Sequence, residues 1–204
     1  MKFQIPFWTG RASLEIDIPD DTPAQWRMRA ALEIAVSNGA SLVGARLDHA
    51  RLDGASLVGA RLDRASLDGA NLVGARLNRA RLVGASLDDA RLVGASLDRA
   101  SLDGARLDRA SLVGARLDDA GTLLGERPVI QIGPIGSRAT YLIGYVTNLG
   151  VRVRTGCFFG SLDEFRAAVA QTHGDGTHGR EYAAAITMIE AHAALWTPPE
   201  GTGS

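Results

Sequence analysis

The chain has 204 residues, 46% of them hydrophobic and 22% charged, with a formal net charge of −1 and one cysteine. This length suits one or two domains with a sizeable core, and the balanced charge argues against a nucleic-acid binder driven by total charge. A single cysteine excludes an intramolecular disulfide framework, and no apolar run approaches the ~20 residues of a membrane span, so we expect a cytoplasmic protein with no membrane or secretion segment.

Residues 1–39 predict a hairpin followed by a helix that together cap what comes next. Alternating apolar residues predict two strands around a turn at Thr9-Gly10, and these residues are Phe3, Ile5 and Phe7, then Leu14, Ile16 and Ile18. Thr22 is the expected helix N-cap, with Pro23 in the first turn and Gln25 completing a capping box. We expect the helix to reach about residue 35, before Asn38-Gly39.

Residues 40–119 are sixteen consecutive pentapeptides with Ala in the first position and Leu in the third. Five residues advance about 500° on an α-helix, so the leucines would form no stripe there. On a flat strand an odd period would send alternate leucines to opposite faces. The leucines share one side if the chain turns once per pentapeptide. Four turns then close one coil, and residues 40–120 predict four stacked coils ~4.8 Å apart.

These pentapeptides, such as Ala70-Asn71-Leu72-Val73-Gly74, resemble those of the pentapeptide-repeat family. The resemblance implies an all-β solenoid, a right-handed quadrilateral β-helix. The family often has Asp or Asn before the central Leu, whereas this chain mostly has Ser or Arg. We expect that second position to face solvent, so the departure changes the surface and leaves the fold intact.

The rest of the chain predicts a small α+β domain. Gly and Pro punctuate residues 121–139, which predict an irregular coil and linker, and residues 198–204 predict a flexible tail. Within residues 140–197 we expect strands at 140–147 and 151–155, a helix from a capping box at Ser161 and Glu164 to about 172, and a helix at 178–195. The expected buried face of the last helix is Tyr182, Ile186, Ile189 and Ala193.

Both flanks are also similar to those of pentapeptide-repeat proteins from bacteriophages and prophages. The residues that carry this similarity are Lys2-Phe3-Gln4-Ile5, Gly133-Pro134-Ile135-Gly136-Ser137-Arg138, Tyr141, Gly156-Cys157-Phe158-Phe159-Gly160-Ser161-Leu162-Asp163-Glu164-Phe165, His173-Gly174 and Tyr182. The similarity implies a phage or prophage source and a C-terminal α+β domain, and it implies no assigned activity.

Stacking every fourth pentapeptide predicts surface columns. One column holds Asp48, Asp68, Asp88 and Asp108, and we expect Arg46, Arg106 and Arg109 to neutralise part of it. The column is either a stripe for a cationic partner or a solvated face with local ion pairs. A second column, Gly54, Gly74, Gly94 and Gly114, predicts turns with positive φ. Three residues that precede these glycines, Val73, Val93 and Val113, predict an exposed apolar strip for a protein partner.

The C-terminal domain supplies a second set of candidates. Arg138, Arg152 and Arg154 are candidate ligands for a small anion or a nucleotide phosphate, or else are ordinary surface arginines. Cys157 and His173 are candidate ligand-binding residues that pair as a nucleophile and a base, although no third orienting residue is evident. The alternatives are a buried small residue for Cys157 and a helix-end residue for His173.

We predict no metal, because His173, Asp175 and His178 would supply just three ligands from a glycine-rich loop, and we predict no cofactor and no catalytic residues. The predicted function is a non-enzymatic, phage-type scaffold that presents a rigid β-helix surface to a protein partner and forms a homodimer through a cap. An enzyme is the weakest alternative, since its reaction is undefined.

Two other functions stay open. One is a protein that sequesters a small molecule such as a nucleotide and so counters host defence. The other is a topoisomerase-binding protein, because some family members resemble a DNA rod and bind gyrase; that mimicry requires a strongly negative surface, and residues 40–119 hold twelve arginines and eleven aspartates. We expect no binding to nucleic acid, because the repeats lack aromatic residues and their charges are interspersed along the sequence.

Overall fold

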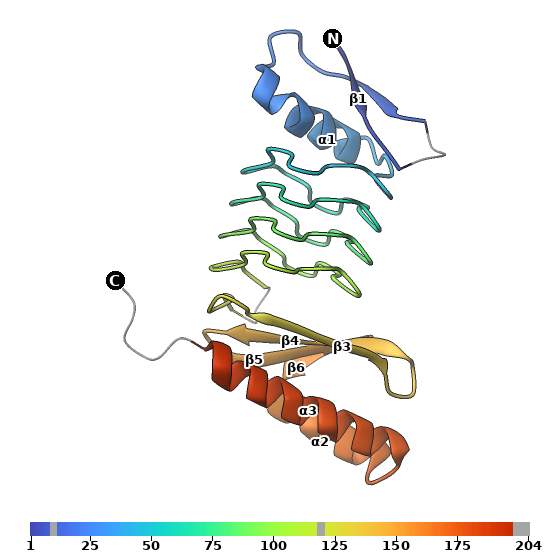
Figure 1. Cartoon of the computed structure of the whole chain (residues 1–204). Helices are drawn as coiled ribbons and strands as arrows, with labels where there is room; N and C mark the ends of the chain where they lie inside the picture. The colour runs from blue at the N-terminus through green and yellow to red at the C-terminus, as the bar shows by residue number, and fades with distance from the viewer. Residues whose placement is uncertain (9–11, 118–120, 198–204) are drawn as a thin grey trace. The chain divides into compact units, whose positions relative to one another are not determined.

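The computed structural model describes residues 1–8, 12–117 and 121–197. Its contacts divide the chain into two compact units, residues 1–118 and 119–204 (Figure 1). The first holds a hairpin, a helix and the repeats, and the second holds a four-stranded sheet with two helices. Within the described ranges, no helix has the length and apolar character needed to cross a membrane. The tail expected at 198–204 lies outside these ranges.

The N-terminal hairpin is confirmed. Strands β1 (Lys2–Ile5) and β2 (Leu14–Asp17) pair antiparallel, with Phe3 opposite Ile16. The turn expected at Thr9-Gly10 lies outside the described residues. After β1 the chain joins the first coil of the repeats, because Phe7 bridges Ala45 and the Arg46 N–H donates to the Pro6 carbonyl at 2.8 Å.

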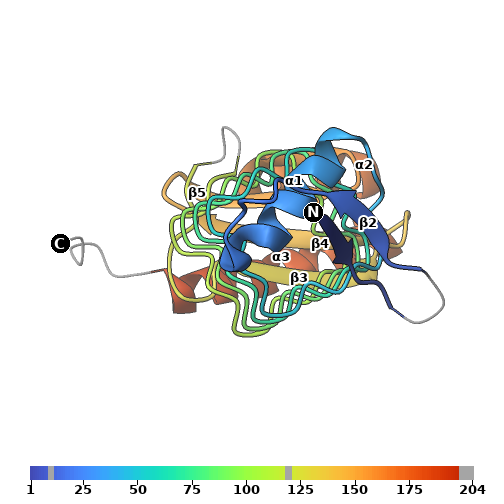
Figure 2. The same cartoon turned by 90° about the horizontal axis from the view of Figure 1, so that it is seen from above.

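The helix that follows begins later than predicted. A short 3-10 turn, η1 (Ala24–Trp26), precedes α1 (Arg27–Ser37), and neither start has a side-chain cap. The expected N-cap at Thr22 is wrong, because its hydroxyl donates at 2.7 Å to the Pro19 carbonyl in a local turn. Helix α1 lies across the start of the coil stack (Figures 1 and 2), where Arg29 donates to the Asp53 carbonyl at 2.8 Å and Glu33 accepts the Ser56 N–H at 2.8 Å.

Residues 40–117 coil with a period of twenty residues. Parallel bridges join second-position residues of successive coils, from Arg46 with Ser66 to Ser96 with Arg116. The Leu72 and Gly74 N–H groups donate to the next coil at 2.7 and 2.9 Å, and the Ala75 N–H closes a turn onto the Leu72 carbonyl at 3.0 Å. Viewed along the stack, the coils overlie one another (Figure 2). A turn in every pentapeptide therefore keeps the leucines on the inner side of the coil despite the five-residue period.

The coil interior is filled by the two invariant residue types. Leu107 excepted, every repeat leucine in the described range is buried, as are the alanines apart from Ala40 and Ala50. Each buried leucine contributes roughly 1.5–3 kcal/mol before the cost of ordering the chain. The second position faces solvent where it holds arginine, as predicted, whereas Ser66 is buried.

Every described corner, from Gly44 to Gly114, uses a left-handed backbone at the fifth position. Gly54, Gly74 and Gly94 have φ of 65°, 65° and 66°, and Gly114 has 73°, which confirms the predicted turns. Six other residues adopt the same conformation without being glycine: His49, Arg64, Arg79, Asp89, Arg99 and Arg109. The corner therefore tolerates long side chains, and these side chains contribute to the charge of the repeat surface.

The second unit is built on an antiparallel sheet. Its strands are β3 (Val129–Ile135), β4 (Thr140–Thr147), β5 (Gly150–Thr155) and β6 (Phe158–Ser161), in the order β3-β4-β5-β6. The expected β4–β5 hairpin is present. Strands β3 and β6 were not predicted, and β3 lies inside the segment expected to be an irregular linker. As an edge strand with a register shift between Ile132 and Ile135, β3 accommodates Pro134.

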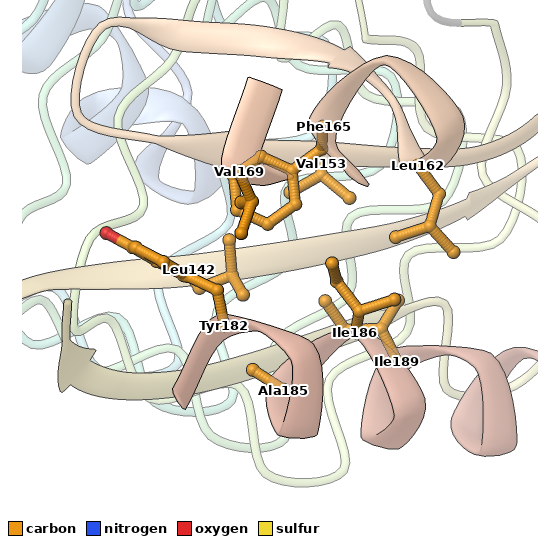
Figure 3. Packing of buried hydrophobic residues seen from close by; sticks show 9 residues of the cluster. All are labelled: Leu142, Val153, Leu162, Phe165, Val169, Tyr182, Ala185, Ile186 and Ile189. Atoms are coloured by element: carbon orange, nitrogen blue, oxygen red, sulfur yellow. The ribbon is translucent and has the colours of Figure 1, made fainter. Parts of the chain in front are cut away.

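Two helices, α2 (Leu162–His173) and α3 (Thr177–Trp196), cover one face of this sheet (Figure 3). Leu142 and Val153 of the sheet pack with Phe165 of α2 and with Tyr182 and Ile186 of α3. The predicted buried face of α3 is confirmed in full, with Gly179 and Ala185 added to it. The capping box at Ser161 and Glu164 is also confirmed.

Candidate functional site

The aspartate column (Asp48, Asp68, Asp88, Asp108) is bonded within the protein. The hydroxyls of Ser66 and Ser86 donate to Asp48 and Asp68 respectively. The N–H groups of Asp88 and Asp108 each donate at 3.1 Å to the carboxylate one coil before. The hydrogen bonds between coils leave these backbone and hydroxyl donors without a partner, and the carboxylates supply one. Part of the column therefore stabilises the fold.

The three arginines expected beside this column have different roles. Arg106 pairs with Asp88, as predicted. Arg46 instead stacks over the Trp8 ring, 5.0 Å from its centroid. Arg109 donates two hydrogen bonds of 2.6 Å to Asp89, which is outside the column, and these bonds lower the pKa of the Asp89 carboxyl and raise that of Arg109.

The valine strip (Val73, Val93, Val113) grows more exposed along the stack, and Val113 is 45% exposed. Two further valines are exposed to a similar degree, Val58 at 37% and Val83 at 36%. They lie in other columns, and sequence reasoning missed them because it followed one column of valines. Exposed apolar residues therefore occur on more than one face of the coils.

Two of the five candidate ligand residues in the second unit come together. The Arg138 guanidinium Nη1 lies 3.5 Å from the Cys157 Sγ. Arg138 follows β3 and Cys157 precedes β6, so two neighbouring hairpin turns supply them. Cys157 is exposed, and the alternative that it is a buried small residue is wrong. It lies in the two-residue turn between the paired strands β5 and β6, where no neighbouring element of the described chain covers the side chain.

Arg152 and Arg154 lie elsewhere on β5. They alternate with Val153, whose side chain enters the core beneath the helices, so both arginines project from the opposite face of the sheet. Arg152 is registered with Tyr145 and Ser161, and its Nε is buried with no hydrogen-bond partner among the described residues. These two arginines therefore do not share the turn surface of Arg138 and Cys157.

His173 ends α2, as the helix-end alternative expects, and its ring lies 5.5 Å from that of Tyr182 and 6.0 Å from that of His178. Tyr182 was predicted as core alone, yet its hydroxyl reaches the turn that follows β3: a Cβ on Gly136 would lie 1.9 Å from it. Burial and the neighbouring Glu181 raise the pKa of Tyr182. Among the residues that the structure describes, no three His, Cys, Asp or Glu side chains are placed to hold a metal ion.

Sequence reasoning missed one further surface. The twenty-residue period brings Arg61 beside Arg81 and Arg79 beside Arg99. Residues 40–119 hold twelve arginines and eleven aspartates, so the total charge of the repeats hides this grouping. The stacking of every fourth pentapeptide that predicted the aspartate, glycine and valine columns also places these arginines one above another, but it was not applied to them.

The comparisons with known proteins concern the repeats. A family model described as pentapeptide repeats matches residues 40–79 and 80–119. The pentapeptide-repeat protein alr5209 from Nostoc PCC 7120 is 37% identical to the chain, over 42% of this chain and 76% of alr5209 (TM-score 0.38). This chain is a pentapeptide-repeat protein.

Other solved structures match this pentapeptide-repeat protein over shorter shares of their length. Rfr23 from the cyanobacterium Cyanothece 51142 is 37% identical over 36% of this chain and 50% of its own (TM-score 0.36). A protein of the Arabidopsis thaliana thylakoid lumen is 32% identical over 38% of this chain and 50% of its own (TM-score 0.27). The chain thus spans half the length of these two relatives. No curated protein matches it.

Proposed function

We propose that this pentapeptide-repeat protein is a non-enzymatic scaffold that presents a rigid β-helix surface to a protein partner. The observation that carries the proposal is the regular hydrogen bonding between coils above a leucine interior. In each pentapeptide from Ala65 to Gly94, the N–H groups of the second, third and fifth positions all donate to a neighbouring coil. These bonds fix the second, fourth and fifth positions on a constant lattice. A partner that binds such a surface does not have to order it first, which favours affinity.

The valine strip is the better candidate contact than the aspartate column. Val93 and Val113 are exposed at neighbouring levels of one column. The carboxylates of Asp48, Asp68 and Asp88 accept bonds from hydroxyl or backbone donors, and a partner would have to replace those bonds to use them. We therefore place the partner on Val73, Val93 and Val113, with the column Asp48, Asp68, Asp88 and Asp108 as its polar margin.

The proposal includes a phage or prophage source, the cytoplasm of a bacterial host as the location, and right-handed coils. The similarity of Lys2-Phe3-Gln4-Ile5 and of the segment from Gly133 to Arg138 to phage-type relatives supports the source. The family resemblance supports the handedness.

The test is capture and reconstitution. Immobilised wild-type protein and a Val93→Ser/Val113→Ser variant are exposed to a bacterial lysate, and retained proteins are identified by mass spectrometry and purified. We expect one purified partner to bind wild type at micromolar affinity or better and to bind the variant at least tenfold more weakly. Val43→Ser, a half-buried valine of a different column, is the matched control. If none of the captured proteins binds the wild type in purified form, the proposal is overturned.

A small anionic ligand such as a nucleotide is a second candidate, favoured by the Arg138 guanidinium at the exposed Cys157 turn. A ligand that binds the folded state alone raises the thermal midpoint, by an amount that grows with its concentration. We expect a nucleotide panel to raise the midpoint of wild type and not of Arg138→Gln. Arg180→Gln, which removes an exposed arginine of α3, is the control. An unchanged midpoint in wild type at millimolar nucleotide removes this candidate.

A further inference from the structure

We propose that four arginines along one corner of the coil stack, the arginine edge (Arg61, Arg79, Arg81, Arg99), bind an acidic segment of a protein partner. This inference rests on the proposed scaffold function and adds the chemistry of the partner. It also places a contact on a different part of the surface from the valine strip.

The edge is created by the twenty-residue coil. Arg61 and Arg81 hold the same second position one coil apart and form a parallel bridge. Arg79 and Arg99 hold the same corner position one coil apart, with φ of 59° and 57°. Because the corner position comes two residues before the next second position, the two stacked pairs flank one corner. All four residues are exposed, and stacked positions repeat at about 4.8 Å.

Charge is segregated around the coils although it is interspersed along the sequence. By the twenty-residue period of the sequence, the two faces that meet at this corner, residues 55–64, 75–84, 95–104 and 115–119, carry seven arginines and five aspartates. The other two faces, residues 45–54, 65–74, 85–94 and 105–114, carry five arginines and six aspartates. The positive excess therefore lies on the side of the arginine edge.

The carboxylates near the edge are the inner groups and the guanidinium groups the outer ones. Asp63 pairs with Arg81 at 3.3 Å, yet the Asp63 side chain is 14% exposed and that of Arg81 is 61% exposed. The Asp98 carboxylate accepts the Ser96 hydroxyl at 3.1 Å and is half-buried. A partner approaching from solvent thus meets positive charge first, which suits carboxylates.

The surroundings of the edge favour a protein over a nucleic acid. Val58 and Val83 are exposed on the same two faces, and apolar contacts add little to phosphate binding. The repeats contain no aromatic side chain on which a base would stack. Lys2 is the chain's single lysine, so every cation of the edge is an arginine. Arginine is enriched at protein interfaces, and its guanidinium donates two hydrogen bonds to one carboxylate.

The test uses fluorescently labelled poly-L-glutamate as the acidic segment and fluorescence anisotropy as the readout. The variant Arg61→Gln/Arg79→Gln removes one arginine from each stacked pair. The control Arg91→Gln/Arg109→Gln removes the same charge from the same two pentapeptide positions on other faces. We expect the edge variant to weaken binding about tenfold, as the sum of two charge contacts, and the control to weaken it less than about twofold.

The outcomes separate this inference from the scaffold proposal. Equal weakening in both variants, or no binding by wild type, overturns it. If wild type binds a DNA duplex or single-stranded oligothymidine more tightly than poly-L-glutamate, and the edge variant loses that binding, the inference is overturned in favour of nucleic acid. If a purified partner binds wild type and the edge variant equally, the scaffold proposal stands and the arginine edge falls. Unchanged circular dichroism shows that each variant is folded.

Discussion

Leucine and alanine divide the interior of each pentapeptide between them. Leucine at the third position fills the axis of the coil, and alanine at the first position lies where the chain turns too tightly for a larger side chain. From Ala55 to Ala115 the first-position side chains are all buried. Interiors this closely packed respond to the loss of a few methyl groups, because neighbouring coils are held by the same hydrogen bonds and relax little.

Leu82→Ala tests this packing. Leu82 is fully buried in the third coil. We expect the free energy of unfolding to fall by about 2–5 kcal/mol, from lost burial and from the cavity left behind. Urea denaturation measures the change. The neighbouring Val83→Ala, at an exposed position, should change it by less than about 0.5 kcal/mol, and a similar loss in both variants would contradict the packing argument.

The corner position offers a test of backbone strain. A Cβ on Gly94 would meet nothing within 4 Å, so the cost of Gly94→Ala falls on the φ of 66° alone. We expect a loss of about 1–2 kcal/mol in thermal or urea unfolding. Arg64→Ala is the control, because Arg64 already has a Cβ at φ 57° and should change little. A neutral Gly94→Ala would mean that the corner does not constrain φ.

At the scale of elements, the predictions succeeded where a local pattern agreed with the tertiary environment. Strands β1, β2, β4 and β5 and both long C-terminal helix segments follow from apolar periodicity and capping residues. Strand β3 could not be predicted, because Gly133 and Pro134 interrupt its pattern and only pairing with β4 makes it a strand. The start of α1 was misplaced because the Thr22 hydroxyl bonds Pro19. Competing local hydrogen bonds of this kind leave no mark in the sequence.

Ser161→Ala tests the cap of α2. The Ser161 hydroxyl accepts the Glu164 N–H at 3.2 Å, and the Glu164 carboxylate accepts the Ser161 N–H at 2.7 Å. We expect the substitution to lower the free energy of unfolding by about 1 kcal/mol, measured by urea denaturation. Asp163→Asn, in the same first turn and outside the box, is the control. A larger loss in the control would show that charge alone, rather than the cap, stabilises this helix start.

The same cap makes a pH-dependent contribution. Hydrogen bonds from Ser161 lower the pKa of Glu164 below its ordinary value. The stabilisation is therefore complete above the ordinary pKa of a glutamate, about 4.3, and is lost as the pH falls through the lower pKa of the folded protein. The stability difference between wild type and Glu164→Gln should shrink in that range, as urea denaturation from pH 7 to pH 3 would measure. A difference that is constant with pH would contradict this.

For the whole molecule, the large hydrophobic residues with the greatest exposure lie in the flanks. Trp8 is 51% exposed in the N-terminal segment, and Met188 and Leu195, seven residues apart on α3, are 55% and 77% exposed. Apolar groups of this kind, larger and more exposed than the valines of the repeats, would drive self-association through a cap.

We therefore expect a dimer, with a mass near twice 21.5 kDa in light scattering at high concentration. Leu195→Ser should shift the population toward monomer, whereas Val113→Ser in the repeats should not. A monomer alone in the wild-type protein would exclude the predicted dimer.

The sequence by itself determined the coil, because a period of five with buried leucines has one solution, a turn in every pentapeptide. It also determined the helix ends at which a capping box or a glycine acts locally. The twenty-residue stacking, and with it the aspartate, glycine and valine columns, also followed from the sequence. The tertiary structure decided which of the stacked groups bond to one another and which are exposed. Residues twenty apart become neighbours when coils stack, so Arg61 meets Arg81, Arg79 meets Arg99, and the aspartates bond each other's backbones. Charges that alternate along the chain are thereby sorted onto different faces, and that sorting depends on distances in space rather than in sequence.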